Sequence, residues 1–201
     1  MFEKLLQVVP WSDILLYISL GLICCALLQK NSNFLDIRKV FTDHFAIFDN
    51  SPLQKFVIFI VPFLLSFSAI STQLLTKDIV NNLNIVLSIL ISMFFAILSI
   101  LSSFTYKSTD PKTVADVSLR KKAEKYNKLL KQTFNAVIFE SVLSIVVLVL
   151  SFAQLFSNDF SETWKLKVIS LIVYYLALVI VFNILVVIKR MKSLFETKAD
   201  N

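Results

Sequence analysis

The chain has 201 residues, of which 57% are hydrophobic and only 17% are charged, and its formal net charge is +6. Soluble domains are usually about half apolar and about a quarter charged, so this composition excludes a single water-exposed globular domain. With one glycine and four prolines, the chain has too few turn-forming residues for an outer-membrane barrel or another β architecture. The composition predicts an all-α, polytopic integral membrane protein.

The first apolar segment covers residues 14–28 and is shorter than the roughly 20 residues that a spanning helix needs. With Trp11 as an interfacial anchor it could cross a thin bilayer, or it could lie in the interface. No small-x-small cleavage site follows it, so we expect a retained helix rather than a secretion signal. Its adjacent Cys24 and Cys25 suit neither a disulfide framework nor a zinc site. We interpret them as small apolar side chains, with reversible acylation as the alternative.

Residues 29–54 form a charge-balanced segment, with three basic and three acidic side chains. Its apolar residues recur at the 3-4-4-3 spacing of an amphipathic helix, with most charges on the other side. We predict a cytoplasmic helix that lies along the inner leaflet, or that packs on the basic segment 105–133 or on a partner protein. The apolar positions of this pattern are Phe34, Ile37, Phe41, Phe45 and Phe48.

Four further segments are long and apolar enough to cross a bilayer. We expect these four to be the membrane spans, and segment 14–28 to be a shorter additional hydrophobic helix. The spans are residues 56–75, 79–104, 134–156 and 166–188.

The loop charges predict the orientation. Residues 105–133 carry eight basic and three acidic side chains, residues 189–201 carry four and two, and loop 157–165 has a net charge of −1. The positive-inside rule therefore places segment 105–133 and the tail 189–201 in the cytoplasm, and loop 157–165 outside. In a bacterium this makes the chain a multi-pass inner-membrane protein with a cytoplasmic C-terminus. The side of the N-terminus depends on whether segment 14–28 spans.

The basic segment 105–133 is predicted to be a helical stalk. Neither glycine nor proline occurs after Pro111, so we expect the helix to continue unbroken into the span 134–156 and to project about 30 Å. The lysines can be explained by cytoplasmic retention and attraction to anionic headgroups, or by docking of a partner protein. Nucleic-acid binding is disfavoured, because aromatic and arginine interleaving is sparse. The candidate docking residues are Arg120, Lys121, Lys122, Lys125, Tyr126, Lys128 and Lys131, together with Phe41 and Phe45.

Polar residues inside the spans are candidates for function, because they are expensive in a bilayer. Glu140 either reaches the headgroups or a lysine, or faces a subunit interface or pore mouth. Asn183 could form interhelical hydrogen bonds, and it is a further candidate for an oligomer or pore interface. A serine stripe in the span 79–104 permits close helix approach, with a hydrated pore wall as the alternative. The stripe contains Ser88, Ser92, Ser99 and Ser103.

Catalytic motifs give no support for an enzyme. The single histidine, His44, has no neighbouring cluster of Cys, Asp or Glu at ligand spacing, and no HExxH, GxSxG or Walker pattern occurs. We therefore predict neither catalytic residues nor a metal or other cofactor.

The order of the segments, two pairs of spans flanking the stalk DPKTVADVSLRKKAEKYNKLLKQ, resembles the KwaA-type membrane subunit of bacterial Kiwa antiphage systems. The resemblance covers the whole chain but rests on layout and composition, and segment 14–28 departs from a four-span pattern. It implies a homo-oligomeric inner-membrane sensor that recruits and restrains a cytoplasmic DNA-binding effector.

Two functions from different classes follow as expectations. The first is a non-catalytic sensor or anchor, homo-oligomeric, that docks a cytoplasmic protein and contacts anionic lipids. The second is a small oligomeric pore that depolarises the membrane, as a holin does. An assembly factor for another membrane complex is a weaker third hypothesis.

Overall fold

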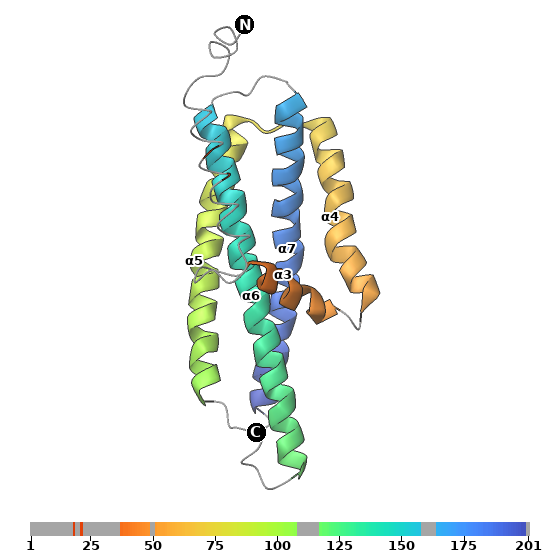
Figure 1. Ribbon diagram of the computed structural model, residues 1–201, viewed down its shortest axis with the longest axis vertical. Helices are drawn as coiled ribbons and strands as arrows, with labels where there is room; N and C mark the ends of the chain where they lie inside the picture. The colour runs from red at the N-terminus through yellow and green to blue at the C-terminus, as the bar shows by residue number, and fades with distance from the viewer. Residues whose placement is uncertain are drawn as a thin grey trace, which may run out of the picture.

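A computed structural model describes residues 18, 21, 37–48, 51–107, 117–157 and 164–199 of the chain. All regular structure in these ranges is helical (Figure 1). Four of the helices are long and apolar enough to cross a membrane, which confirms the all-α prediction and its four candidate spans. The elements are α3 (Ile37–Phe45), the short 3₁₀ helix η1 (Ala46–Phe48), α4 (Pro52–Thr72), α5 (Lys77–Lys107), α6 (Val117–Ser157) and α7 (Trp164–Ala199).

Segment 14–28 falls almost entirely outside the described residues, as do Cys24, Cys25 and Phe34. Only Ile18 and Gly21 of that segment are described, both as helical. The prediction of an additional N-terminal helix therefore stays a prediction.

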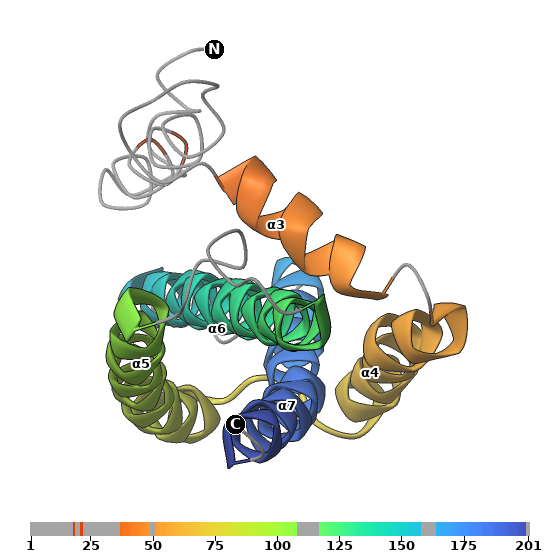
Figure 2. The same cartoon turned by 90° about the horizontal axis from the view of Figure 1, so that it is seen from below.

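The four long helices run antiparallel and lie side by side in the order α5, α6, α7, α4 (Figure 2). The pair α6 and α7 packs as a hairpin, but α4 packs against α7 rather than beside its sequence neighbour α5. The link 73–76 connects them by passing α7, where the buried backbone N–H of Leu75 donates a hydrogen bond to Ser170 Oγ at 3.2 Å. The first two spans are thus neighbours in sequence but not in space.

Helix α6 is the central element of the bundle. In the most apolar stretch of α6, 56% of the residues are buried inside the protein, against 17% in α4 and in α5. The outer faces of α4 and α5 instead expose large apolar side chains, such as Phe56, Phe67 and Phe95. Such faces are stable in a bilayer, because lipid tails are as apolar as these side chains.

Helix α6 is 41 residues long, or roughly 60 Å at 1.5 Å per residue, about twice the hydrocarbon thickness. It runs from the basic segment into the apolar one without a break, as the absence of glycine and proline there predicts. The N-terminal half of α6 also packs against other helices. Leu130 lies in one cluster with Leu101 of α5 and Leu194 of α7.

The expected free stalk is therefore largely part of a bundle. The residues expected to form a tail after 188 continue α7 as far as Ala199. Only the first part of α6 extends beyond the ends of α5 and α7 (Figure 1).

Helix α3 lies across the outside of α6. The Phe41 ring meets Phe139 of α6 edge-on at a centroid distance of 5.0 Å, and Phe48 of η1 is buried. Of the alternatives for segment 29–54, the structure shows packing within the chain. The contact is made to the apolar part of α6 rather than to its basic segment.

Candidate functional site

The most unusual feature of the interior is a set of three polar side chains that come from three helices. His44 of α3 is 1% exposed, and Glu140 of α6 and Asn183 of α7 are fully buried. Asn183 is the common neighbour, since its side chain interacts with both His44 and Glu140. The three residues lie far apart in the sequence, so the sequence does not reveal that their side chains are close in space.

His44 is held by aromatic contacts. Its ring stacks on Phe139 at a centroid distance of 3.8 Å with an interplanar angle of 5°, and it meets the Phe48 ring edge-on at 5.3 Å. The pKa of His44 is lowered from 6.5 to about 4, mainly by burial and also by the positive charge of Arg190, while Asn183 opposes the shift. His44 is therefore neutral at pH 7, a state that suits its aromatic surroundings.

Glu140 and Asn183 lack the partners that buried polar groups usually have. Within the described residues, no polar side-chain atom of His44, Glu140 or Asn183 makes a hydrogen bond of standard geometry. Asn183 is near both of the other groups but not aligned with them as a donor or acceptor. An unsatisfied buried polar group costs about 1–3 kcal/mol, and more if charged, so this cluster destabilises the fold. Such groups in a membrane protein point to function.

The structure also decides between the interpretations of Glu140. The carboxyl group reaches neither solvent nor, among the described residues, a lysine. The interpretation in which it reaches the headgroups is wrong for the single chain. Glu140 instead lies against Asn183, inside the bundle.

Two polar contacts flank the cluster and tie helices together. Arg190 of α7 donates a hydrogen bond from Nη1 to Gln132 Oε1 of α6 at 2.8 Å. Asn135 of α6 donates a longer one, at 3.4 Å, to Asp43 Oδ2 of α3. The Arg190 guanidinium is the cation that acts on His44, so the cluster and these contacts share one electrostatic environment.

Helix α6 carries a buried seam that includes Glu140. Its positions alternate at spacings of four and three residues, the heptad pattern of a helix packed between neighbours. Several members are small or polar, and the Ser144 and Ser151 hydroxyls make no hydrogen bond to another described residue. The seam consists of Thr133, Val137, Glu140, Ser144, Val147, Ser151 and Gln154, each at most 4% exposed. The heptad spacing was the sequence signal that could have revealed it.

The predicted serine stripe lies elsewhere. Ser88, Ser92, Ser99 and Ser103 of α5 are all exposed, so they line no helix contact within one chain. Three of these hydroxyls donate to backbone carbonyls of their own helix, for example Ser92 Oγ to the Ser88 carbonyl at 3.0 Å. A role at an interface between copies of the chain stays a prediction.

The predicted docking residues divide into two groups. The basic side chains Arg120, Lys121, Lys122, Lys125, Lys128 and Lys131 are all exposed, and Arg120 forms an exposed ion pair with Glu124 at 3.2 Å.

The aromatic docking candidates are instead engaged within the chain. Tyr126 is half-buried against the cluster that contains Leu101, Leu130 and Leu194. Phe41 packs on Phe139, and Phe45 packs on Phe59 of α4 at 5.0 Å. The structure thus does not join Phe41 and Phe45 to the basic residues in one surface.

In the described part of the chain, no three His, Cys, Asp or Glu side chains are grouped closely enough to hold a metal ion. Comparison of the chain with protein-family models, curated proteins and solved structures gave no significant match.

Proposed function

We propose that this chain is a non-catalytic subunit of the bacterial inner membrane that oligomerises and docks a cytoplasmic protein at the basic end of its bundle. The observation that supports the proposal is that α6 and α7 are much longer than a membrane span and extend well past it at this end. Helices α6 and α7 have 41 and 36 residues, although about 20 suffice to cross a bilayer. Among the residues whose exposure the structure describes, most of the exposed cations lie in these surplus parts of α6 and α7.

The basic end is also a defined surface rather than a loose tail. Phe104 of α5 and Phe195 of α7 meet edge-on at 6.0 Å, and Leu130 of α6 is buried in the same cluster. This packing fixes the backbone of α6 around Leu130, and the unbroken helix continues from there to the lysines nearer its start, so a partner would meet them at set spacings. An acidic protein surface is the complementary partner, and steering by such charges speeds association.

The test reverses charge at the basic end. Lys121→Glu, Lys122→Glu and Lys125→Glu are combined, and the tagged protein is purified in mild detergent from its native genomic context. We expect loss of a stoichiometric cytoplasmic chain that the unaltered protein retains. Lys165→Glu with Lys167→Glu, exposed at the other end of the bundle, is the matched control. Unchanged recovery of the partner with the triple variant, at preserved topology, would refute the proposal.

The resemblance to the KwaA-type subunit, if it reflects kinship, specifies the partner as a DNA-binding effector that is released when a phage perturbs the envelope. A phage challenge tests this extension. The intact system would protect the culture, and the triple variant would either lose protection or become toxic without phage. Protection unaffected by the triple variant would contradict it.

A second candidate is a small oligomeric pore, and the buried seam of α6 favours it. Unsatisfied hydroxyl and carboxyl groups along one helix are what a water or proton path requires. This candidate predicts that expression of the chain alone depolarises cells, and that Glu140→Gln or Ser144→Val reduces the effect. Normal membrane potential at high expression would exclude it.

A further inference from the structure

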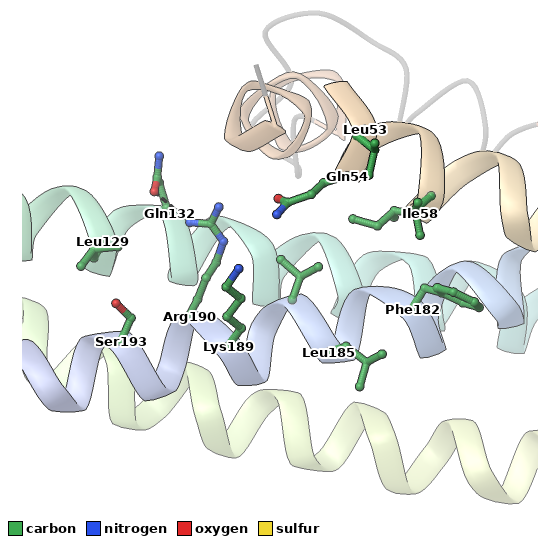
Figure 3. Close-up of a pocket in the computed structure, with 12 residues that line it drawn as sticks. Leu53, Gln54, Ile58, Leu129, Gln132, Phe182, Leu185, Lys189, Arg190 and Ser193 are labelled. Carbon is green, nitrogen blue, oxygen red and sulfur yellow. Dashed lines mark hydrogen bonds between the residues drawn. The ribbon is translucent and has the colours of Figure 1, made fainter. Parts of the chain in front are cut away.

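A pocket of about 650 Å³ lies between the start of α4, the first half of α6 and the second half of α7 (Figure 3). This volume falls within the roughly 300–1,000 Å³ range of small-molecule sites. The side chains of Gln54, Lys189 and Arg190 are directed into the space between α4 and α7 (Figure 3). The pocket is distinct from the buried cluster of His44, Glu140 and Asn183.

The lining changes character along the bundle axis. Toward the basic end it is polar, with Gln132, Lys189 and Arg190; toward the middle of the bundle it is apolar, with Phe182 and Leu185. The change coincides with the sequence borders of the spans, which begin at 56 and 134 and end at 188. In the orientation that the loop charges predict, the polar part would lie at the cytoplasmic membrane surface and the apolar part within the hydrocarbon.

The charge of the pocket is uncompensated. Two lining residues, Lys189 and Arg190, are cationic and no lining residue is acidic. Within the described residues neither cation has a carboxylate partner, and the buried Nε of Arg190 makes no hydrogen bond. Gln132 accepts from Arg190 Nη1 at 2.8 Å and orients the guanidinium. An oriented guanidinium beside a lysine is suited to a phosphate group.

We propose that this pocket binds an anionic phospholipid from the inner leaflet. Its phosphate would lie against Arg190 and Lys189, and its acyl chain would follow the apolar wall formed by Val57 and Leu185. Basic pockets between membrane helices at the cytoplasmic side are typical sites for acidic lipid headgroups. The proposed lipid would occupy one defined position in the pocket. This differs from the general electrostatic attraction of the α6 lysines to anionic headgroups. The lipid would also fill the space between α4 and α7 and hold α4 to the bundle.

The test uses the full chain, purified and delipidated, and then exposed to phosphatidylglycerol or phosphatidylcholine, with bound lipids counted by native mass spectrometry. We expect retention of phosphatidylglycerol with a preference of about tenfold or more. Both lipids carry a phosphate, but the choline cation of phosphatidylcholine makes its headgroup net neutral and would be repelled by Lys189 and Arg190. Lys189→Gln with Arg190→Gln should abolish this preference. Lys192→Gln is the matched control: Lys192 lies on the same helix, is 76% exposed, does not line the pocket and pairs with Glu196.

Equal binding of the two lipids, or an equal loss in the Lys192→Gln control, would overturn the proposal. If the double variant fails to fold, the exposed Lys189→Gln variant alone decides, with a clear drop in preference expected and no change as the opposing result. Glycerol 3-phosphate, which has the phosphate but no acyl chain, should not displace the lipid. Displacement by glycerol 3-phosphate would show that the site recognises a free phosphate compound and not a lipid.

Discussion

The side chain of His44 joins α3 to the rest of the bundle. Its neutral ring stacks on Phe139 and excludes water, while Arg190 and Asn183 act on it from α7. Protonation would place a positive charge in this buried site, and burial disfavours charge. A protonated His44 would therefore favour the state in which α3 is not docked. The contact that holds α3 is therefore sensitive to pH.

Acidification should undock α3. The pKa of His44 is about 4 when docked and 6.5 when exposed, so between these values the undocked state binds more protons. Stability of docking is complete above pH 6.5 and falls as the pH drops toward 4, by up to about 3 kcal/mol. Hydrogen exchange of α3 at pH 7.5 and pH 5, corrected for intrinsic rates, measures this. His44→Phe, which keeps an aromatic ring but cannot titrate, should show no pH dependence; equal α3 protection of the unaltered chain at both pH values would contradict the prediction.

Replacing Glu140 should stabilise the fold. Glu140→Met removes two unsatisfied buried oxygens while keeping a similar volume, so we expect a gain of about 1–3 kcal/mol. Thermal unfolding in detergent is the measurement, and Glu140→Gln, which keeps a polar group, should gain less. If Glu140 serves the function, the stabilised protein loses activity. A lower melting temperature for Glu140→Met would instead show that the carboxyl group has stabilising partners.

At the scale of the element, α6 organises the molecule. Its seam packs toward α5 and α7, and its other surface receives α3. Small side chains such as Ser144 and Ser151 let neighbouring backbones approach closely, which is the main packing device of membrane helices. Large apolar residues at the same positions would keep the helix apolar but would not fit.

Leucine substitutions separate the two serine sets. Ser144→Leu should destabilise the chain by about 1–3 kcal/mol, because the site is fully buried and overpacking strains its neighbours. Ser92→Leu on the exposed face of α5 should leave the melting temperature of a monomer nearly unchanged. If the α5 stripe forms an interface between copies, Ser92→Leu will change the oligomeric state in light scattering. Equal thermal effects of the two substitutions would contradict this assignment.

At the scale of the whole molecule, the basic termini of the helices gather at one end. The start of α6 and the ends of α5 and α7 lie there, whereas α4 begins part-way along the bundle (Figure 1). The pocket lies beside the start of α4. This arrangement follows from four antiparallel spans. The orientation of the bundle in the membrane therefore determines whether the basic end and the pocket face the cytoplasm.

Reporter fusions test the orientation. By the positive-inside rule, green fluorescent protein fused after residue 199 should fluoresce and alkaline phosphatase fused there should be inactive. Fusions within loop 157–165 should give the opposite pattern. Active phosphatase at the C-terminus would show that the topology is inverted. That result would contradict both the docking proposal and the inner-leaflet lipid site.

The sequence by itself determined the class of the protein and its four spans, because a spanning helix must satisfy its own backbone hydrogen bonds and be apolar over a fixed length. Both requirements are local, so composition and segment length reveal them. The continuity of α6 followed from the same kind of local signal.

Only the tertiary structure decided which helices are neighbours and which side chains meet. In a bilayer every spanning helix is apolar all round, so hydrophobicity cannot say which face of α5 or α6 turns inward. The serines of α5 turned out to face outward, and Ser141, Ser144 and Ser151 of α6 inward. His44, Glu140 and Asn183 are brought together because α3 crosses α6 where α7 also packs, a juxtaposition that depends on the whole bundle.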